Sequence, residues 1–240
     1  MSSRRPRRWL RRLVVTLVVL GVLAVAVDRA AAWVAENQLA TMAEKEAAQY
    51  DVRAADTSVQ IGGFGFLPQL ARERFSKVTL TMKQPTFDSI PAEDLKVELH
   101  GVQVPRGLLT RTPGTAVTID TTDVRLQLSP AELAKLAVRS TGVQGLTLDA
   151  VDGKLNAKLS IRGVEAEATL RPQVEKGRIV LTVDELSDAV PSFVRNAVRN
   201  QLSRAITLPK LPYGATLKQV SVEGNSIVLT ATAADLKFAA

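Results

Sequence analysis

The sequence predicts an α+β fold, with antiparallel strands and long amphipathic helices behind one N-terminal membrane helix. Apolar residues recur at three- and four-residue steps in two segments, 32–50 and 191–206, as on one face of a helix. Between and after these segments apolar and polar residues alternate, which is typical of strands with one apolar face. The order helix, strands, helix, strands differs from the βαβ alternation of nucleotide-binding folds.

The N-terminus combines a basic cluster with an apolar run. Six arginines lie within residues 4–12, and residues 13–27 carry no charge. This combination is typical of an export signal or a membrane anchor. Fifteen helical residues span ~22 Å, which is short of a ~30 Å hydrocarbon core. Length alone therefore leaves cleavage and retention of this segment open.

Two small-residue cleavage motifs follow, Ala24-Val25-Ala26 and Ala30-Ala31-Ala32, but the helical pattern continues through both. Cleavage there would open the first helix of the domain, so we favour an uncleaved single-pass anchor. By the positive-inside rule, residues 1–12 are then a cytoplasmic basic tail, residues 13–27 cross the cell membrane, and residues 28–240 form one extracytoplasmic domain. A cleaved periplasmic or cell-envelope form is the alternative.

The basic charge belongs to the N-terminal tail. The chain has a formal net charge of +7, and removing the six arginines of the tail leaves +1. The domain therefore lacks the basic surface of a nucleic-acid binder. Cysteine is absent, which excludes disulfides, thiolate nucleophiles and cysteine metal sites.

Within the domain, the alternation predicts strands near 59–62, 78–82, 95–104 and 117–128. The apolar phase slips at Gly101, which predicts a bulge or a bend. Ser129-Pro130-Ala131-Glu132 is a capping box that opens a short helix ending before Gly142. Hairpin turns are expected at 152–153, 176–177 and 223–225, so the sheet is predicted to be antiparallel and meandering.

The residues that could carry catalysis fit structural roles better. The only histidine, His100, is predicted to face solvent from a strand, and no hydrolase, phosphate-loop or metal-binding motif occurs. Two carboxylate pairs, Asp120 with Asp123 and Asp149 with Asp152, are explained by a strand irregularity and a turn. We therefore expect no catalytic residue, no metal and no cofactor.

Two further stretches point to a known family. One runs Gly62-Gly63-Phe64-Gly65-Phe66-Leu67-Pro68-Gln69-Leu70 and leads into the strand from Phe75 to Met82. The other runs Leu208-Pro209-Lys210-Leu211-Pro212-Tyr213-Gly214 and leads into residues 220–232. With the export helix and Asp28 behind it, the chain resembles the LmeA family of phospholipid-binding envelope proteins of actinobacteria. One departure is Gly65, where that family usually has proline.

The resemblance implies a fold related to the tubular lipid-binding proteins, in which a strongly curved antiparallel sheet wraps a long helix around an apolar cavity. It also implies binding of phosphoinositide-type phospholipids and a role in maintaining mannosylated envelope glycolipids. We place the entrance near the Gly62–Leu70 corner and the two long helices. The expected lipid-binding residues are Phe64, Phe66, Leu67, Leu70, Phe75, Leu80, Met82, Leu95, Val97, Phe193, Val194 and Ala197.

Three hypotheses follow from the sequence. The leading one is a non-enzymatic binder, and carrier, of phospholipid or glycolipid at the outer side of the membrane. The second is a structural adaptor whose helix near 32–50 docks an envelope biosynthetic enzyme. The third is an enzyme acting on envelope glycans, which would need a deep polar cleft with paired carboxylates. The sequence leaves open whether the alternating apolar residues line a cavity or close into a packed core.

Overall fold

The computed structural model describes residues 7–49, 51–87, 90–108, 115–143, 145–161, 164–186, 191–202, 206 and 214–239. Its helices are α1 (Arg7–Gln49), α2 (Phe66–Ala71), α3 (Pro130–Thr141) and α4 (Ser192–Leu202), with one 3-10 turn, η1 (Arg106–Leu108). Its strands are β1 (Asp56–Gly62), β2 (Arg74–Lys83), β3 (Thr86–Phe87), β4 (Ile90–Pro91), β5 (Asp94–Gln103), β6 (Ala116–Leu128), β7 (Thr147–Val151), β8 (Lys154–Ile161), β9 (Val164–Glu175), β10 (Arg178–Leu186), β11 (Thr216–Glu223) and β12 (Ser226–Ala239).

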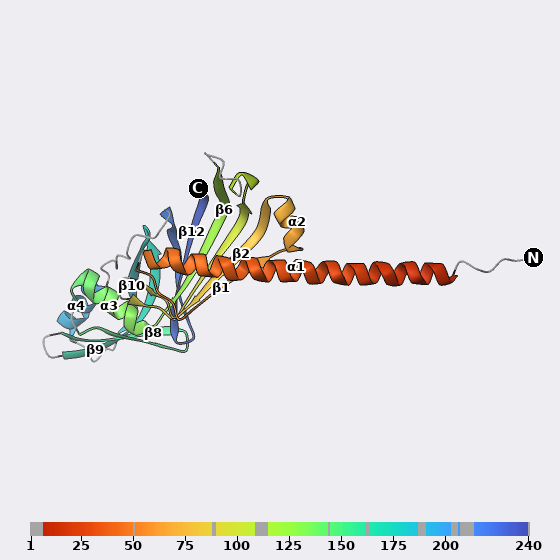
Figure 1. Cartoon of the computed structure of the whole chain (residues 1–240). Helices are drawn as coiled ribbons and strands as arrows, with labels where there is room; N and C mark the ends of the chain where they lie inside the picture. Colours follow the sequence, from red (N-terminus) through yellow and green to blue (C-terminus); the bar gives the residue numbers. More distant parts are fainter. Residues whose placement is uncertain are drawn as a thin grey trace, which may run out of the picture.

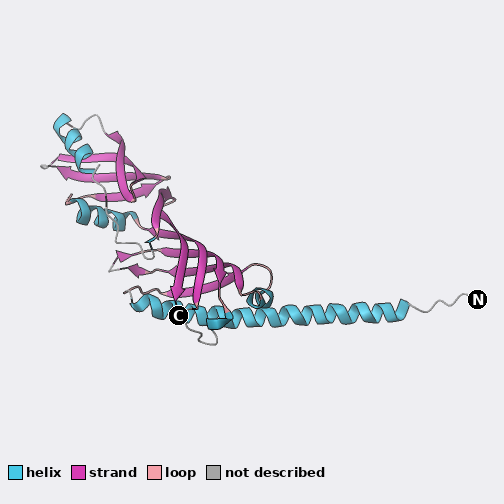
Figure 2. Cartoon of the chain, turned by 90° about the horizontal axis from the view of Figure 1, so that it is seen from above, coloured by secondary structure: helices cyan, strands magenta, loops and turns pink. Residues whose placement is uncertain are grey.

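The strands form two main sheets and a small hairpin (Figures 1 and 2). The six-stranded sheet has the order β1-β2-β5-β6-β12-β11, the four-stranded sheet has the order β10-β9-β8-β7, and β3 pairs with β4. Each of these pairings is antiparallel. The predicted α+β class and antiparallel pairing are confirmed, but a single meander is not, because β7–β10 form a sheet of their own. The sheets are not strongly curled, so the predicted wrapping around the helices stays a prediction.

Helix α1 is continuous from the basic tail into the domain. Its N-terminal part projects beyond the sheets (Figure 1), and residues 14–27 are exposed. The helix is long and apolar enough to cross a membrane. Its C-terminal part lies along β1 and α2, so the same helix is both the apolar projecting segment and a structural element of the domain. Tyr50, the predicted last residue of this helix, lies outside the described residues.

The largest apolar core lies where the two sheets meet. It contains Leu133 and Leu136 of α3, Leu155 of β8, Ile179 of β10 and Ile227 of β12. Strand β11 lies against β9, and α3 contacts both β7 and β12. Burying these side chains joins the two sheets into one folded body, with each fully buried leucine or isoleucine contributing about 1.5–3 kcal/mol.

The predicted N-cap at Ser129 and the predicted turns are confirmed, while the Glu132 carboxylate pairs with Lys135 at 2.6 Å. Ser129 Oγ accepts a hydrogen bond from the Glu132 N–H at 3.3 Å, and Pro130 occupies the first turn of α3. The helix ends at Gly142, whose φ of +74° is the left-handed conformation of a helix C-cap. Asp152 and Lys176 also have positive φ in the tight turns of their hairpins.

The second predicted long helix is shorter than its apolar pattern suggested. Helix α4 ends at Leu202, whereas the pattern predicted a helix to Ile206. Ile206 instead forms an isolated β-bridge with Ile179: its N–H donates to the Ile179 carbonyl at 2.7 Å, and its carbonyl accepts from the Ile179 N–H at 3.2 Å. Tertiary pairing with the edge of β10 therefore overrides the helical pattern. Arg204 and Ala205 lie outside the described residues.

A row of irregular residues crosses four strands at one level. On each of these strands one residue has no paired partner in the neighbouring strand: Ser76 on β2, Gly101 on β5, Asp120 on β6 and Asp235 on β12. The pairing register is the same before and after these residues. Gly101 and Asp235 have φ of +64° and +53°. The irregularity predicted at Gly101 is therefore present. It causes no register shift, because the neighbouring strands each have an unpaired residue at the same position across the sheet.

Candidate functional site

A cavity of about 980 Å³ lies between the C-terminal part of α1 and one face of the six-stranded sheet. Helix α1 contributes Leu39, Met42 and Ala43, and the sheet contributes residues of β2, β5, β6, β11 and β12. Among the described residues that line it, all are apolar except Lys45, Glu46 and Thr122. At ~30 Å³ per water-sized group, the cavity has room for roughly 30 methylene groups.

Several sheet side chains that line the cavity are only half-buried although they lie on central strands: Leu95, Val97 and Leu99 of β5 and Val124 and Leu126 of β6. In a close-packed interior such positions are fully covered. Other lining residues, such as Leu128, Leu217 and Leu229, are buried and belong to the core at the junction of the sheets. The core at the junction of the sheets shows this contrast, since Leu133, Leu155 and Ile179 have 0% exposure. The alternating apolar residues of the six-stranded sheet therefore line a hollow.

Polar groups occupy few positions in the lining. Lys45 and Glu46 lie in the last turns of α1, so charged lining is confined to that end of the helix. Thr122 is 6% exposed, and its hydroxyl has no hydrogen-bond partner within the described part of the chain. The walls between these points present hydrocarbon alone, which suits acyl chains and disfavours polar ligands.

The opposite face of the same sheet is charged. Glu98 of β5 accepts hydrogen bonds from Lys77 and Lys96, both at 2.8 Å. These two ammonium groups lower the pKa of Glu98 from 4.5 to about 2. His100 Nε2 lies 3.7 Å from Glu98 and 3.6 Å from Asp123, which agrees with its predicted outward position.

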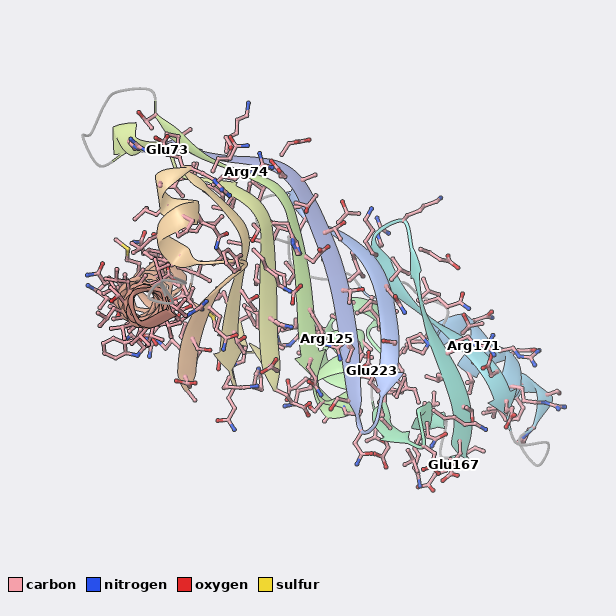
Figure 3. All side chains as sticks on the ribbon, turned by 90° about the vertical axis from the view of Figure 1, so that its right-hand side faces the viewer. Glu73, Arg74, Arg125, Glu167, Arg171 and Glu223 are labelled. Carbon is pink, nitrogen blue, oxygen red and sulfur yellow. The ribbon has the colours of Figure 1, made fainter. Side chains whose placement is uncertain are left out.

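Further ion pairs follow the outer surface, and Figure 3 labels Arg74, Arg125 and Glu223 among their members. Arg125 of β6 forms two hydrogen bonds to Glu223 of β11, at 3.1 and 2.6 Å. This contact raises the pKa of Arg125 and lowers that of Glu223. Arg74 pairs with Asp120 at 2.7 Å. The sheet thus has one hydrocarbon face and one ionic face, so only the cavity face can hold an apolar ligand.

A second apolar cluster lies at the end of the cavity nearest α2. Its buried members are Phe75, Val102 and Ile119, and Phe66 of α2 packs against them. The Phe66 and Phe75 rings have centroids 5.8 Å apart. Ile119 also lines the cavity, so apolar contact is continuous from the cavity to α2.

The corner between β1 and α2 is held by one buried amide. Gln69 Nε2 donates to the carbonyls of Gly62 and Gly65 at 3.1 and 2.9 Å, and Gln69 Oε1 accepts from the Ser76 N–H at 2.8 Å. The φ of Gly63 is +102°, and a Cβ there would lie 2.3 Å from Ser76 Oγ. The corner therefore needs glycine at position 63.

Two carboxylates of α1 fasten this corner to the helix. Asp28 accepts hydrogen bonds from the N–H groups of Phe66 at 2.9 Å and Leu67 at 2.7 Å, and Asp28 is 8% exposed. Asp28 thereby holds the first turn of α2 against α1, and its negative charge is favoured there by the helix dipole of α2. Glu36 accepts from the Ile61 N–H at 2.7 Å, which holds β1 to the same helix.

Gly65 stands where the resemblance implies proline. Its φ is +68°, a conformation that proline cannot adopt because its ring holds φ near −65°. The start of α2 in this chain is therefore built on a backbone conformation that requires glycine.

The structure does not bring the predicted lipid-binding residues together at one place. Leu80, Leu95 and Val97 line the cavity. Phe66 and Phe75 belong to the second cluster, and Met82 is buried at 4% exposure on β2. The remaining corner residues are exposed at the surface: Phe64, Leu67 and Leu70.

The α4 residues lie elsewhere. Phe193 is 53% exposed, Val194 is fully buried, and Ala197 lies on the same short helix, which packs on β10, β8 and β9 of the four-stranded sheet. None of the three lines the cavity as described. Sequence periodicity shows that α4 has an apolar face but not which sheet covers that face.

Several cavity residues were missing from the predicted set. They come from α1 and from the strands β6 and β12, for example Met42, Val124 and Leu229. Their signal was present in the sequence, because positions 124, 126 and 128 and positions 227, 229 and 231 alternate in the same way as the chosen strands. Only the order of strands in the sheet shows that these faces lie on one side.

No metal centre or acid-base pair emerges from the described residues. They contain no group of three or more His, Asp or Glu side chains that could hold a metal ion. Of the carboxylates considered from the sequence, Asp120 is paired with Arg74 and Asp152 forms a turn. Within the described residues, the carboxylates Asp120 and Asp152 therefore have structural roles, and the cavity offers a surface that can bind hydrocarbon.

Comparison with known proteins agrees with this chemistry. Residues 26–232 match the model of a family described as LmeA-like phospholipid-binding. Neither the curated proteins nor the solved structures provide a match. The matched range begins two residues before Asp28 and includes the part of α1 that lies in the domain, the corner, and the strands that line the cavity up to residue 232 within β12. The chain belongs to the LmeA-like phospholipid-binding family.

Proposed function

We propose that the protein binds phospholipid without catalysis, with its acyl chains in the cavity between α1 and the six-stranded sheet. The observation that carries this proposal is the hollow itself: about 980 Å³ walled by half-buried Leu and Val side chains. An apolar surface of this kind is costly to leave open to water, at ~25 cal/mol per Å². A bound acyl chain removes that cost.

The energetics of lipid exchange favour such a cavity. Exposing an acyl chain to water costs ~0.8 kcal/mol per CH₂, and two chains together exceed ~20 kcal/mol. A protein can therefore accept a lipid from a bilayer only if its interior is as apolar as the bilayer. The cavity meets this requirement, and its volume suits one lipid with two chains. A closer curl of the sheet around α1 belongs, in this proposal, to the lipid-loaded form.

We place the domain at the outer side of the cell membrane, with α1 as an uncleaved single-pass anchor and residues 1–12 in the cytoplasm. The contact of Asp28 with the corner supports retention. Cleavage after Ala32 would remove Asp28 and leave the N–H groups of Phe66 and Leu67 without their acceptor. Residues 28–240 then act as one extracytoplasmic lipid-binding domain.

The finer features of the function rest on the resemblance. They are a phosphoinositide-type head group, transfer of the lipid, and support of envelope glycolipid maintenance. The entrance is placed at the corner, because Phe66 of the corner packs on Phe75, and Ile119 of the same cluster lines the cavity. Phe66→Asp or Leu70→Asp is expected to abolish lipid co-purification while the domain stays folded.

The direct test is native mass spectrometry with lipid extraction on the full chain. Wild type is expected to carry phospholipid at near-unit stoichiometry, and fragmentation of the lipid identifies its head group. Leu80→Trp fills the cavity and is expected to lose the lipid. Thr79→Trp is the matched control, because residue 79 alternates with residue 80 on β2 and does not line the cavity.

The alternative function, docking of an envelope biosynthetic enzyme on α1, predicts a different result. A folded wild-type protein without bound lipid, together with a partner crosslinked to the exposed side of α1 near Trp33, would support docking and contradict the lipid-binding proposal. Equal lipid content in the Leu80→Trp and Thr79→Trp variants would instead show that the lipid binds outside the cavity.

A further inference from the structure

We infer that the corner from Gly62 to Ala71 is a membrane-docking surface that rests on the bilayer crossed by α1. This inference rests on the proposed anchor and adds a contact that the lipid-binding function does not require. Its occupant is the outer surface of that same bilayer, with anionic phospholipid among its lipids.

The corner lies beside the point on α1 at which the apolar run ends. The apolar run ends at Val27, and the next residue, Asp28, holds the N–H groups of Phe66 and Leu67. Along a helix one residue corresponds to a rise of ~1.5 Å. The first turn of α2 is therefore fixed within a few ångströms of the level at which the apolar segment leaves the hydrocarbon. Figure 1 shows α2 at the end of the sheet from which α1 projects.

The corner exposes large apolar side chains. Phe64 is 95% exposed, and Leu67 and Leu70 of α2 are 39% and 41% exposed. Three large apolar side chains exposed within seven residues are typical of a surface that binds a membrane or another molecule. Facing the interface of a bilayer, the same side chains are covered, because aromatic and aliphatic groups partition into the headgroup and upper acyl region.

Arginine side chains lie around the corner. Arg29 follows Asp28 on α1, Arg72 follows the last residue of α2, and both are exposed. Arg106 of η1 reaches back to the Ala71 carbonyl at 2.7 Å and pairs with Glu73. Arginines beside an apolar tip match the phosphate layer of an anionic membrane.

Docking at this corner gives lipid a path that avoids water. Phe66, on the same short helix as Leu67 and Leu70, packs on Phe75, and Ile119 of that cluster lines the cavity. A lipid that leaves the outer leaflet beneath the corner therefore exchanges one hydrocarbon surface for another. A corner held away from the bilayer would expose the chains to water during transfer.

The test is depth-resolved fluorescence quenching on the full chain in vesicles of phosphatidylcholine and phosphatidylglycerol that carry brominated acyl chains. Both native tryptophans, Trp9 and Trp33, are replaced by Phe. A single tryptophan is then placed at Phe64, at Val22 within the apolar run, or at Phe193. Phe193→Trp is the matched control, because Phe193 is also an exposed phenylalanine, at 53%, and lies on α4, which packs on the other sheet.

Bromolipid is expected to quench the Phe64→Trp and Val22→Trp emission to roughly half or less, as for side chains in the interface and hydrocarbon, and to leave Phe193→Trp unchanged. Quenching at position 22 without quenching at position 64 would overturn the docking surface while keeping the anchor. Absence of quenching at position 22 would overturn both. Lipid content, measured separately by mass spectrometry, decides the lipid-binding proposal, so the two can fail independently.

Discussion

Asp28 and Phe66, 38 residues apart in the chain, are joined by a hydrogen bond of 2.9 Å from the Phe66 N–H to the Asp28 carboxylate. The second oxygen of the same carboxylate accepts from the next N–H, that of Leu67, at 2.7 Å. One side chain therefore links the end of the apolar segment to the first turn of α2. Because both partners on α2 are backbone groups, the link depends on the identity of residue 28 alone.

Asp28→Ala is expected to free the corner from α1. Hydrogen exchange at the Phe66 and Leu67 amides should accelerate, because both lose their acceptor. Exchange at Ile61 should stay slow, since its N–H is bound by Glu36 at 2.7 Å. Glu36→Ala is the matched control and should accelerate Ile61 alone. Unchanged exchange at Phe66 and Leu67 in Asp28→Ala would contradict the role given to this carboxylate.

Gln69→Leu is expected to destabilise the domain by roughly 2–4 kcal/mol, because the carbonyls of Gly62 and Gly65 and the Ser76 N–H lose their hydrogen bonds to the buried amide. Urea unfolding, followed by circular dichroism, measures the change. Gln60→Leu, at an exposed position of β1, controls for the substitution type and should change stability little. A Gln69→Leu variant as stable as the control would show that solvent replaces the amide.

Stability should fall with acid through Glu98. Its pKa is lowered to about 2 by the hydrogen bonds from Lys77 and Lys96. A lowered folded-state pKa contributes stability that is complete above the unfolded value near 4.5 and is lost as pH falls toward 2. Glu98→Gln removes this contribution. The thermal midpoint of wild type should therefore fall more steeply than that of Glu98→Gln between about pH 4.5 and 2, and parallel curves would contradict the assignment.

Gly101→Ala tests the irregular row across the sheet. The residue has φ of +64°, and a Cβ there would lie 2.0 Å from Asp120 Oδ2. Strain and clash together should cost roughly 2–4 kcal/mol, measured by denaturant unfolding. Gly177→Ala separates the two effects, since Gly177 has φ of +74° and open space around its Cβ position. It should cost about 1–2 kcal/mol from the backbone alone.

If the clash is real, adding Asp120→Ala to Gly101→Ala should recover part of the lost stability, because the shorter side chain leaves room for the new methyl group. Asp120→Ala alone removes the exposed ion pair with Arg74, for which a loss of about 0–1 kcal/mol is expected. Equal losses in Gly101→Ala and Gly177→Ala would show that the Asp120 carboxylate simply moves aside.

Much of the local structure followed from the sequence because it depends on neighbours along the chain. The capping box at Ser129, the glycine turns and the alternation in β5 and β6 are set by hydrogen bonds and side-chain directions within a few residues. Helix α2 was missed because six residues around Pro68 carry too short an apolar pattern for a helix. Helix α4 was drawn too long because periodicity does not register the bridge between Ile206 and Ile179.

The candidate site was predicted only in part. Of the residues predicted by alternation, Leu80, Leu95 and Val97 line the cavity, since a strand's apolar face has to meet something apolar. Val194 was assigned to the site on the same grounds but is buried against the other sheet. Both kinds of residue have the same local pattern, so pattern alone cannot separate a cavity wall from a packed core.

By itself the sequence determined the basic tail, the apolar segment, the α+β class, the antiparallel strands and the family. These follow from charge, hydrophobic period and motif, which are properties of short segments. Only the tertiary structure decided that the strands divide into two sheets, that α1 leaves a hollow over one of them, and that Asp28 holds the corner at the end of the apolar segment. Those features depend on contacts between residues far apart in the chain, such as Asp28 with Leu67.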